Sequence, residues 1–295
     1  MSAHPTARPP PDWSQLLIDA VARPGVISSA YSRFWHYSVG NQLLAMFECL
    51  FRQIPPGPIH TYKGWHKLGR QVKKGEKAIS LRMPVQVRRK KSEPPTNDDG
   101  DPMVGDGAER NAGRATRTVF AFKPHWFVLS QTEGEDVPPT ELPDWGEQRA
   151  LERLNIQRVP FDNPNGNVQG VAAERTVAVS PIAVLPHKTL FHELAHVVLG
   201  HTAELRRMDD HERTPVNLRE VEAESVALIC CESLGLPGDD CCRGYIQSWL
   251  SRGSDGAIPS RSAQRIFRAA DEILKAGYPY ECLGQFLRSP EPEPV

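Results

Sequence analysis

One apolar stretch in the second half of the chain dictates the architecture around it: Leu190-Phe191-His192-Glu193-Leu194-Ala195-His196-Val197-Val198-Leu199-Gly200. Apolar side chains surround only three polar ones, so the stretch is predicted to form an almost wholly buried helix. Pro186 and Thr189 suit the start of this helix, and Gly200 suits its C-terminal end. The three polar side chains are therefore expected to be functional, because burying them is costly.

These polar residues form the pattern His-Glu-x-x-His. Residues four apart share a helical face, so His192 and His196 can both direct imidazole nitrogens at one ion, with Glu193 beside them. The pattern is that of zinc hydrolases, in which the glutamate acts as general base on a bound water. The alternative is a pair of core histidines satisfied by hydrogen bonds. We predict a Zn²⁺ site bound by His192 and His196, with Glu193 as the catalytic residue.

A second apolar helix, predicted from Arg219 to Cys231, carries three glutamates near its start, Glu220, Glu222 and Glu224. Glu220 and Glu224 share one face of this helix. Carboxylates in a solvated first turn could simply complement the helix dipole. However, two histidines leave a zinc site one protein ligand short, so we expect this helix to supply the third.

A strongly basic segment lies in the first half of the chain. Residues 60–91 contain eleven Lys or Arg and one acid, Glu76, although the whole chain has a net charge of −1. A solvated basic face is one interpretation. Cations interleaved with aromatic rings also suit single-stranded nucleic acid, because the cations follow phosphates and the rings stack on bases. No recognition helix for duplex DNA is evident. The predicted DNA contacts are Tyr62, Lys63, Trp65, Lys67, Arg70, Lys73, Lys74 and Lys77.

The helices and strands predicted along the chain indicate an α+β protein, and 295 residues are enough for two domains. The first, residues 13–135, combines helices with strands at 78–88 and 118–129, the second strand broken near Pro124. A disordered insertion, residues 92–116, separates these strands. The Pro-rich run at 137–143 marks the boundary, and the second domain covers residues 144–288. Residues 1–10 and 289–295 are expected to be disordered tails.

The chain is expected to be cytoplasmic and to have no membrane partner. No apolar run approaches the roughly 20 residues that cross a bilayer, and the N-terminus has no apolar signal segment. The six cysteines lack the C-x-x-C spacing of zinc ribbons and redox motifs. The sequence does not indicate an oligomeric state.

Several stretches taken together resemble the ArdC-type antirestriction proteins. They are residues 37–44, 61–77, 127–134, 191–196, 220–224, 245–250 and 269–274. The resemblance implies an N-terminal single-stranded-DNA-binding domain followed by a zincin-like zinc metallopeptidase domain. The second domain is also similar to ImmA/IrrE metallopeptidases, whose Glu-x-Glu-Ala-x helix supplies the third metal ligand.

The resemblance favours Glu220 as that ligand and makes Glu224 the partner that orients a histidine, although Glu224 stays open as the ligand. His201 does not fit the spacing of a third histidine ligand and is left out of the site.

Three functions from different classes remain. The first is a single-stranded-DNA-binding zinc metallopeptidase that protects or processes mobile or incoming DNA. The second is a protein that shields DNA and whose zinc site is structural. The third is a regulatory protease that cleaves a repressor, for which the basic segment would have no use. A peptidase function would require a protein substrate, which the sequence does not identify.

Overall fold

The computed structural model describes residues 11–88, 116–138, 141–204, 214–252 and 256–282. The predicted disordered insertion at 92–116, apart from residue 116, and both predicted tails lie outside these ranges. The described residues form a mixed α+β structure, which confirms the predicted fold class at that level. None of the described helices is long and apolar enough to cross a membrane.

Three N-terminal helices come first: α1 (Trp13–Ala22), α2 (Val26–Phe34) and α3 (Val39–Phe51). The carboxylate of Asp12 caps α1 by accepting a hydrogen bond of 3.0 Å from the N–H of Ser14. Sequence analysis did not predict α2, where aromatic residues such as Tyr31 and Phe34 are buried at helical spacing. These aromatic side chains therefore belong to the core.

An antiparallel sheet follows, built from β1 (Ile59–Thr61), β4 (Thr116–Val128) and β3 (Ile79–Arg88) in the order β1-β4-β3. The predicted break near Pro124 is wrong, because β4 is continuous through it. Instead, Ile79 pairs with Trp126 and Ser80 with Pro124, which leaves His125 as the extra residue of a β-bulge.

A smaller unit lies beside this sheet. It contains α4 (Tyr62–Lys67), the 3₁₀ turn η1 (Leu129–Gln131), and a two-stranded antiparallel pair, β2 (Arg70–Val72) with β5 (Thr132–Gly134). The side-chain oxygen of Thr61 caps α4 by accepting from the N–H of Gly64 at 3.1 Å.

The C-terminal half begins with α5 (Glu147–Leu154) and a sheet in the order β6-β8-β7, made of β6 (Gln157–Arg158), β7 (Gly170–Ala173) and β8 (Thr176–Val179). Strand β7 is antiparallel to β8, and β6 is parallel to it. The helices that follow are α6 (Pro186–Val198), α7 (His201–Glu204), α8 (Val216–Leu234), α9 (Asp239–Leu250) and α10 (Ser260–Ala276).

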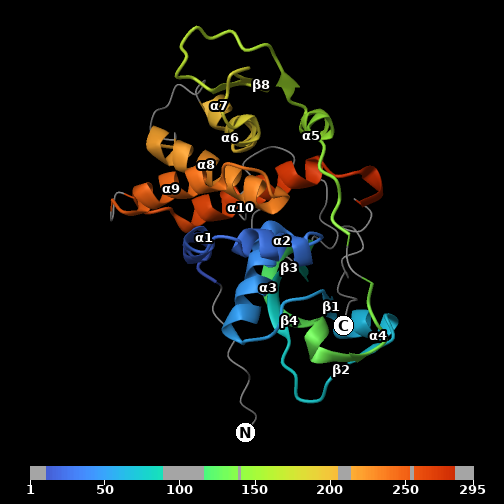
Figure 1. Ribbon diagram of the computed structural model, residues 1–295. Coiled ribbons are helices and arrows are strands. Elements are labelled where there is room, and N and C mark those ends of the chain that lie inside the picture. Colours follow the sequence, from blue (N-terminus) through green and yellow to red (C-terminus); the bar gives the residue numbers. More distant parts are fainter. Residues whose placement is uncertain (1–10, 89–115, 139–140, 205–213, 253–255, 283–295) are drawn as a thin grey trace.

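The elements stack in layers along the molecule (Figure 1). The β8 sheet and α6 lie at one end, α8, α9 and α10 follow, and α1–α3 come next, with the β1-β4-β3 sheet at the other end. Helix α1 packs on α9 and α10, and α2 packs on α8. One continuous apolar cluster extends from α1 to α10. The division into two domains stays a prediction, and the core crosses the predicted boundary.

Candidate metal centre

Two histidine side chains of α6 lie next to each other on one face of the helix. The Nε2 atoms of His192 and His196, one helical turn apart, are separated by 3.1 Å. The rest of the turn is held by buried apolar residues, among them Phe191, Leu194 and Ala195. This packing fixes the rotation of α6, so both imidazoles are directed at the same point.

Helix α8 brings a carboxylate to these nitrogens. Glu220 Oε2 lies 3.4 Å from His192 Nε2, and Glu220 Oε1 lies 3.7 Å from His196 Nε2. Three donors that bind a tetrahedral ion at 2.0–2.1 Å would stand about 3.3 Å apart, so the set fits an ion such as Zn²⁺ and leaves a fourth position open. Within the described ranges this is the one group of three or more His, Cys, Asp and Glu side chains that brings ligand atoms so close together.

Glu224, one turn further along α8, occupies a different place. Its Oε2 lies 2.9 Å from Nδ1 of His192, and its Oε1 pairs with Lys188 Nζ at 2.8 Å. Burial opposes ionisation of Glu224, but the hydrogen bond to His192 and the pairing with Lys188 lower its pKa to about 2. Glu224 is therefore turned to the Nδ1 side of His192, while Glu220 faces the Nε2 side.

Glu193 projects beside the two histidines against strand β7. Its side chain is 8% exposed, and burial raises its pKa to about 7. A Cβ atom at Gly170 of β7 would lie 2.6 Å from Oε1 of Glu193, so the strand backbone approaches this carboxyl very closely. A carboxyl with a pKa near neutrality is suited to exchange protons with a reacting group.

Sequence analysis missed the residue beneath His196. Gly200, at a φ of +81°, turns the chain after α6, and His201 then packs back under the centre with its Nδ1 3.0 Å from Nδ1 of His196. Its spacing had been considered only for a direct ligand. The sequence signal for this arrangement is the glycine between His196 and His201, because a glycine that ends a helix commonly reverses the direction of the chain.

The predicted DNA contacts do not all lie on the surface. Trp65 is fully buried, and its indole N–H donates to the carbonyl oxygen of Phe127 at 2.8 Å. The structure therefore contradicts Trp65 as a base-stacking residue, because its ring packs in the core. Tyr62, in the same helix, is 52% exposed and remains available.

Among the predicted basic contacts, Arg70 has an internal role. Its guanidinium donates to Thr132 Oγ1 at 2.8 Å and to the carbonyl oxygen of Gly134 at 3.1 Å, which ties β2 to β5. Lys73 Nζ donates to the carbonyl oxygen of Ser130 at 3.0 Å. The exposed members of the predicted set are Tyr62, Lys63, Lys67, Lys73, Lys74 and Lys77.

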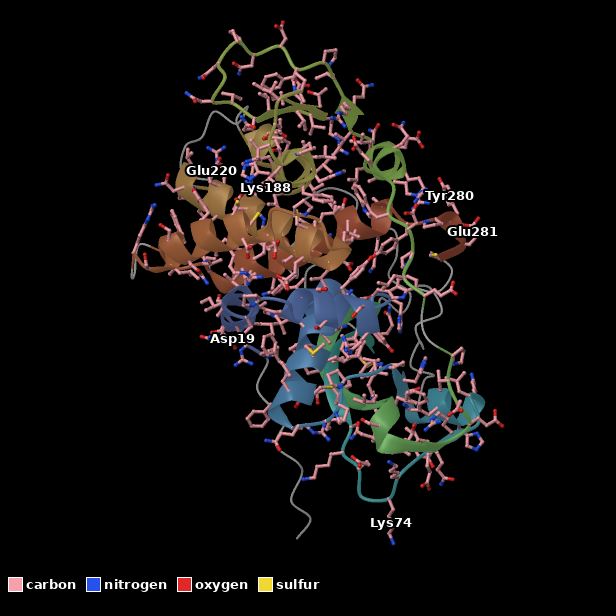
Figure 2. The ribbon with its side chains drawn as sticks, in the orientation of Figure 1. Asp19, Lys74, Lys188, Glu220, Tyr280 and Glu281 are labelled. Atoms are coloured by element: carbon pink, nitrogen blue, oxygen red, sulfur yellow. The ribbon has the colours of Figure 1, made fainter. Side chains whose placement is uncertain are left out.

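The basic segment lies far from the candidate metal-binding cluster, which consists of His192, His196 and Glu220. Figure 2 shows Lys74 at one end of the molecule and Glu220, beside Lys188, near the other, with Asp19 of α1 between them. The layers α8–α10 and α1–α3 separate the two regions (Figure 1).

Comparison with known proteins identifies relatives in one family. A family model described as the N-terminal domain of anti-restriction factor ArdC matches residues 15–122. The Mn(II)-bound crystal structure of the antirestriction ArdC protein from plasmid R388 has a TM-score of 0.50 and 18% sequence identity, and the match covers 91% of this chain and 98% of that chain. The metal-free structure of that protein has a TM-score of 0.47 and 19% identity, with 93% and 97% covered. No curated protein sequence matches the chain.

Proposed function

Because residues 15–122 match the ArdC N-terminal domain and the chain shares the ArdC fold, this is an ArdC-type protein, and we propose that it acts in antirestriction through two separate sites. One is a single-stranded-DNA-binding surface on residues 62–77. The other is a zincin-like metallopeptidase centre in the C-terminal half. The predicted resemblance to the ArdC type is confirmed, and the two activities are the proposal.

One observation carries the metallopeptidase proposal: two imidazoles and one carboxylate converge within 4.8 Å beside a buried glutamate. Two nitrogen donors and one oxygen donor suit Zn²⁺, which we propose as the metal. The R388 protein has been crystallised with Mn(II), so a divalent ion at this centre agrees with its relative. A bound Zn²⁺ would lower the pKa of a water in its open position to about 7.

In the proposed reaction Glu193 handles the proton. Its carboxylate accepts a proton from the attacking water and delivers it to the leaving amine of the peptide. His192, His196 and Glu220 hold the ion, and Glu224 keeps the proton of His192 on Nδ1, so that Nε2 offers its lone pair.

Strand β7 gives the centre a place for a peptide. It is an edge strand of the order β6-β8-β7, and its Gly170 lies against Glu193. An extended peptide can add to such an edge through main-chain hydrogen bonds, which would bring its carbonyl groups past the general base. The substrate class that fits is therefore an extended protein segment.

The distance between the two regions favours a second candidate, in which the protein shields DNA and the metal is structural. The nucleotides held directly by residues 62–77 would lie away from His192, His196 and Glu220 (Figure 2). Neither candidate requires chemistry on the DNA itself. A repressor protease without DNA binding agrees less well, because it leaves the exposed lysines Lys67, Lys74 and Lys77 without a role.

Metal analysis and peptide hydrolysis by the full-length protein test the proposal. We expect one Zn²⁺ per chain, lost in His196→Ala and retained in His187→Ala, which alters an exposed histidine of the same helix. Glu193→Gln should keep the metal and abolish peptide hydrolysis, while the exposed Glu152→Gln changes neither. Stoichiometric zinc in His196→Ala would overturn the site. Zinc without hydrolysis in the parent protein would favour the shielding function.

A further inference from the structure

The two candidate histidine ligands are supported in different ways on their Nδ1 sides. His192 contacts the carboxylate of Glu224 directly, at 2.9 Å. His196 contacts another imidazole, that of His201, with 3.0 Å between the two Nδ1 atoms. His201 in turn contacts Glu222, with its Nε2 2.8 Å from Oε2. A second buried chain of polar groups therefore ends at the metal-binding cluster.

The members of this chain are withdrawn from water. His201 is 2% exposed and the side chain of Glu222 is fully buried. Arg265 of α10 stands 3.6 Å from the other oxygen of Glu222 and donates to the carbonyl oxygen of Leu199 at 2.6 Å. Its guanidinium therefore places a positive charge beside the buried carboxyl group of Glu222.

Hydrogen-bond chemistry then determines where each proton lies. Carboxylate oxygens are acceptors, so the short contact assigns the donor role to Nε2–H of His201, with Glu222 as the acceptor. The other ring nitrogen of His201, Nδ1, is then the acceptor for Nδ1–H of His196. That leaves a lone pair on Nε2 of His196, which is the atom that faces His192 and Glu220. The order of these hydrogen bonds, from His196 to His201 and from His201 to Glu222, thus selects the tautomer that can bind a metal.

We propose that His201 and Glu222 are positioning residues, which hold His196 in the tautomer and ring orientation needed to bind a divalent metal. The proposal rests on the proposed metal centre. It gives three of the four glutamates of α8 separate roles at this centre: Glu220 faces the ion, Glu224 orients His192 directly, and Glu222 orients His196 through His201. Neither His201 nor Glu222 touches the ion.

The test measures Zn²⁺ affinity of the full-length protein by competition with a chelator. His201→Leu removes the acceptor for His196 and should weaken Zn²⁺ binding by about 10- to 100-fold, the usual loss for partners of metal-bound histidines. His201→Gln offers an amide oxygen to His196 and an amide N–H to Glu222, so it should restore a large part of the affinity. His187→Ala, on the exposed side of α6, should bind Zn²⁺ like the parent.

A second measurement separates positioning from general loss of structure. In metal-free protein labelled with ¹⁵N-histidine, NMR should show the Nδ1–H tautomer of His196. Glu222→Gln can donate as well as accept, so it permits the reverse order of hydrogen bonds and should populate the Nε2–H tautomer. Glu222→Gln keeps the shape of the side chain, so it tests the positioning role even if His201→Leu does not fold.

The outcomes distinguish the two proposals. Unchanged affinity in folded His201→Leu and an unchanged tautomer in Glu222→Gln would overturn the positioning role while leaving the metal centre intact. If the parent protein itself binds no Zn²⁺, the proposed metal centre fails and the positioning role fails with it. Equal losses in His201→Leu and His201→Gln would also overturn the proposal, because packing alone would then explain the effect.

Discussion

Glu232, in the buried last turn of α8, accepts a hydrogen bond of 3.0 Å from the backbone N–H of Ile27 at the start of α2. Arg243 of α9 donates to the second oxygen of this carboxylate and also to the carbonyl oxygen of Ala20 at 3.3 Å. In the same way, Asp271 of α10 accepts from the N–H of Val39 at the start of α3, at 3.3 Å. Carboxylates of the C-terminal half thus cap two helices of the N-terminal half.

Removing the Glu232 carboxylate should strongly destabilise the protein. Glu232→Ala leaves the buried guanidinium of Arg243 unpaired, which typically costs about 3–5 kcal/mol. Urea denaturation of the full-length protein measures the free energy of unfolding. The control is Glu147→Ala, which breaks the more exposed pair with Arg158 and should cost less than about 1 kcal/mol. Equal effects of the two substitutions would contradict the role of the buried pair.

Single-stranded DNA binding should depend on Lys74 and Tyr62 in different ways. Lys74→Ala removes one phosphate contact, so the slope of log affinity against log salt should fall by about 0.7. Tyr62→Ala should cost about 1–3 kcal/mol of stacking and leave the slope unchanged. Gel shifts at several salt concentrations measure both. Arg261→Ala, which removes an exposed charge from α10, is the control and should change neither quantity. Stronger binding to duplex than to single-stranded DNA would contradict the prediction.

A methyl group at Gly170 should disturb Glu193 without removing the ligands. The added Cβ would stand 2.6 Å from both Oε1 of Glu193 and Cγ2 of Thr189. We expect Gly170→Ala to destabilise the fold by about 1–3 kcal/mol, as overpacking does, and to reduce peptide hydrolysis while zinc stays bound. Gly166→Ala adds the same methyl group where no atom lies within 4 Å, and should be neutral. Parent-like stability and hydrolysis in Gly170→Ala would show that the close approach does not constrain Glu193.

Acid should lower the free energy of unfolding through protonation of His36. Burial, with His60 nearby, lowers the pKa of His36 to about 4, from about 6.5 in the unfolded chain. Between these values the unfolded state binds more protons, so the free energy of unfolding should fall as pH drops from 6.5 to 4. His36→Gln should flatten this dependence in urea denaturation, whereas His66→Gln, at an exposed position, should preserve it. A parent-like pH dependence in His36→Gln would contradict the assignment.

Periodicity was sufficient to predict the helices that bear the candidate ligands. The spacing of His192 and His196 and the face shared by Glu220 and Glu224 follow from the geometry of a helix alone. Strands β7 and β8 also follow a local pattern, because short apolar runs separated by a turn indicate a hairpin. The third metal ligand and the DNA contacts stay predictions, although the geometry brings Glu220 to the two nitrogens.

Tertiary contacts decided what periodicity could not. Trp65 lies among lysines in the sequence, and its ring is buried by tertiary packing, in which its N–H reaches the carbonyl group of Phe127, 62 residues away. His201 follows a helix end, and its return beneath His196 depends on the left-handed turn at Gly200. The sequence marks a boundary at the Pro-rich run, but it does not reveal that Glu232 reaches α2 across it.

Residues 135–138 and 141–146, between β5 and α5, run along the outside of the layers, and Glu135, Asp136 and Glu141 are exposed (Figure 1). The buried contacts of α1–α3 with α8–α10 do not depend on this connection. A protease that cuts the segment would therefore produce a nicked molecule whose two pieces remain associated and purify together. The same point in the chain is a natural place for split-protein complementation, in which two separately expressed pieces reassemble and restore both sites at once.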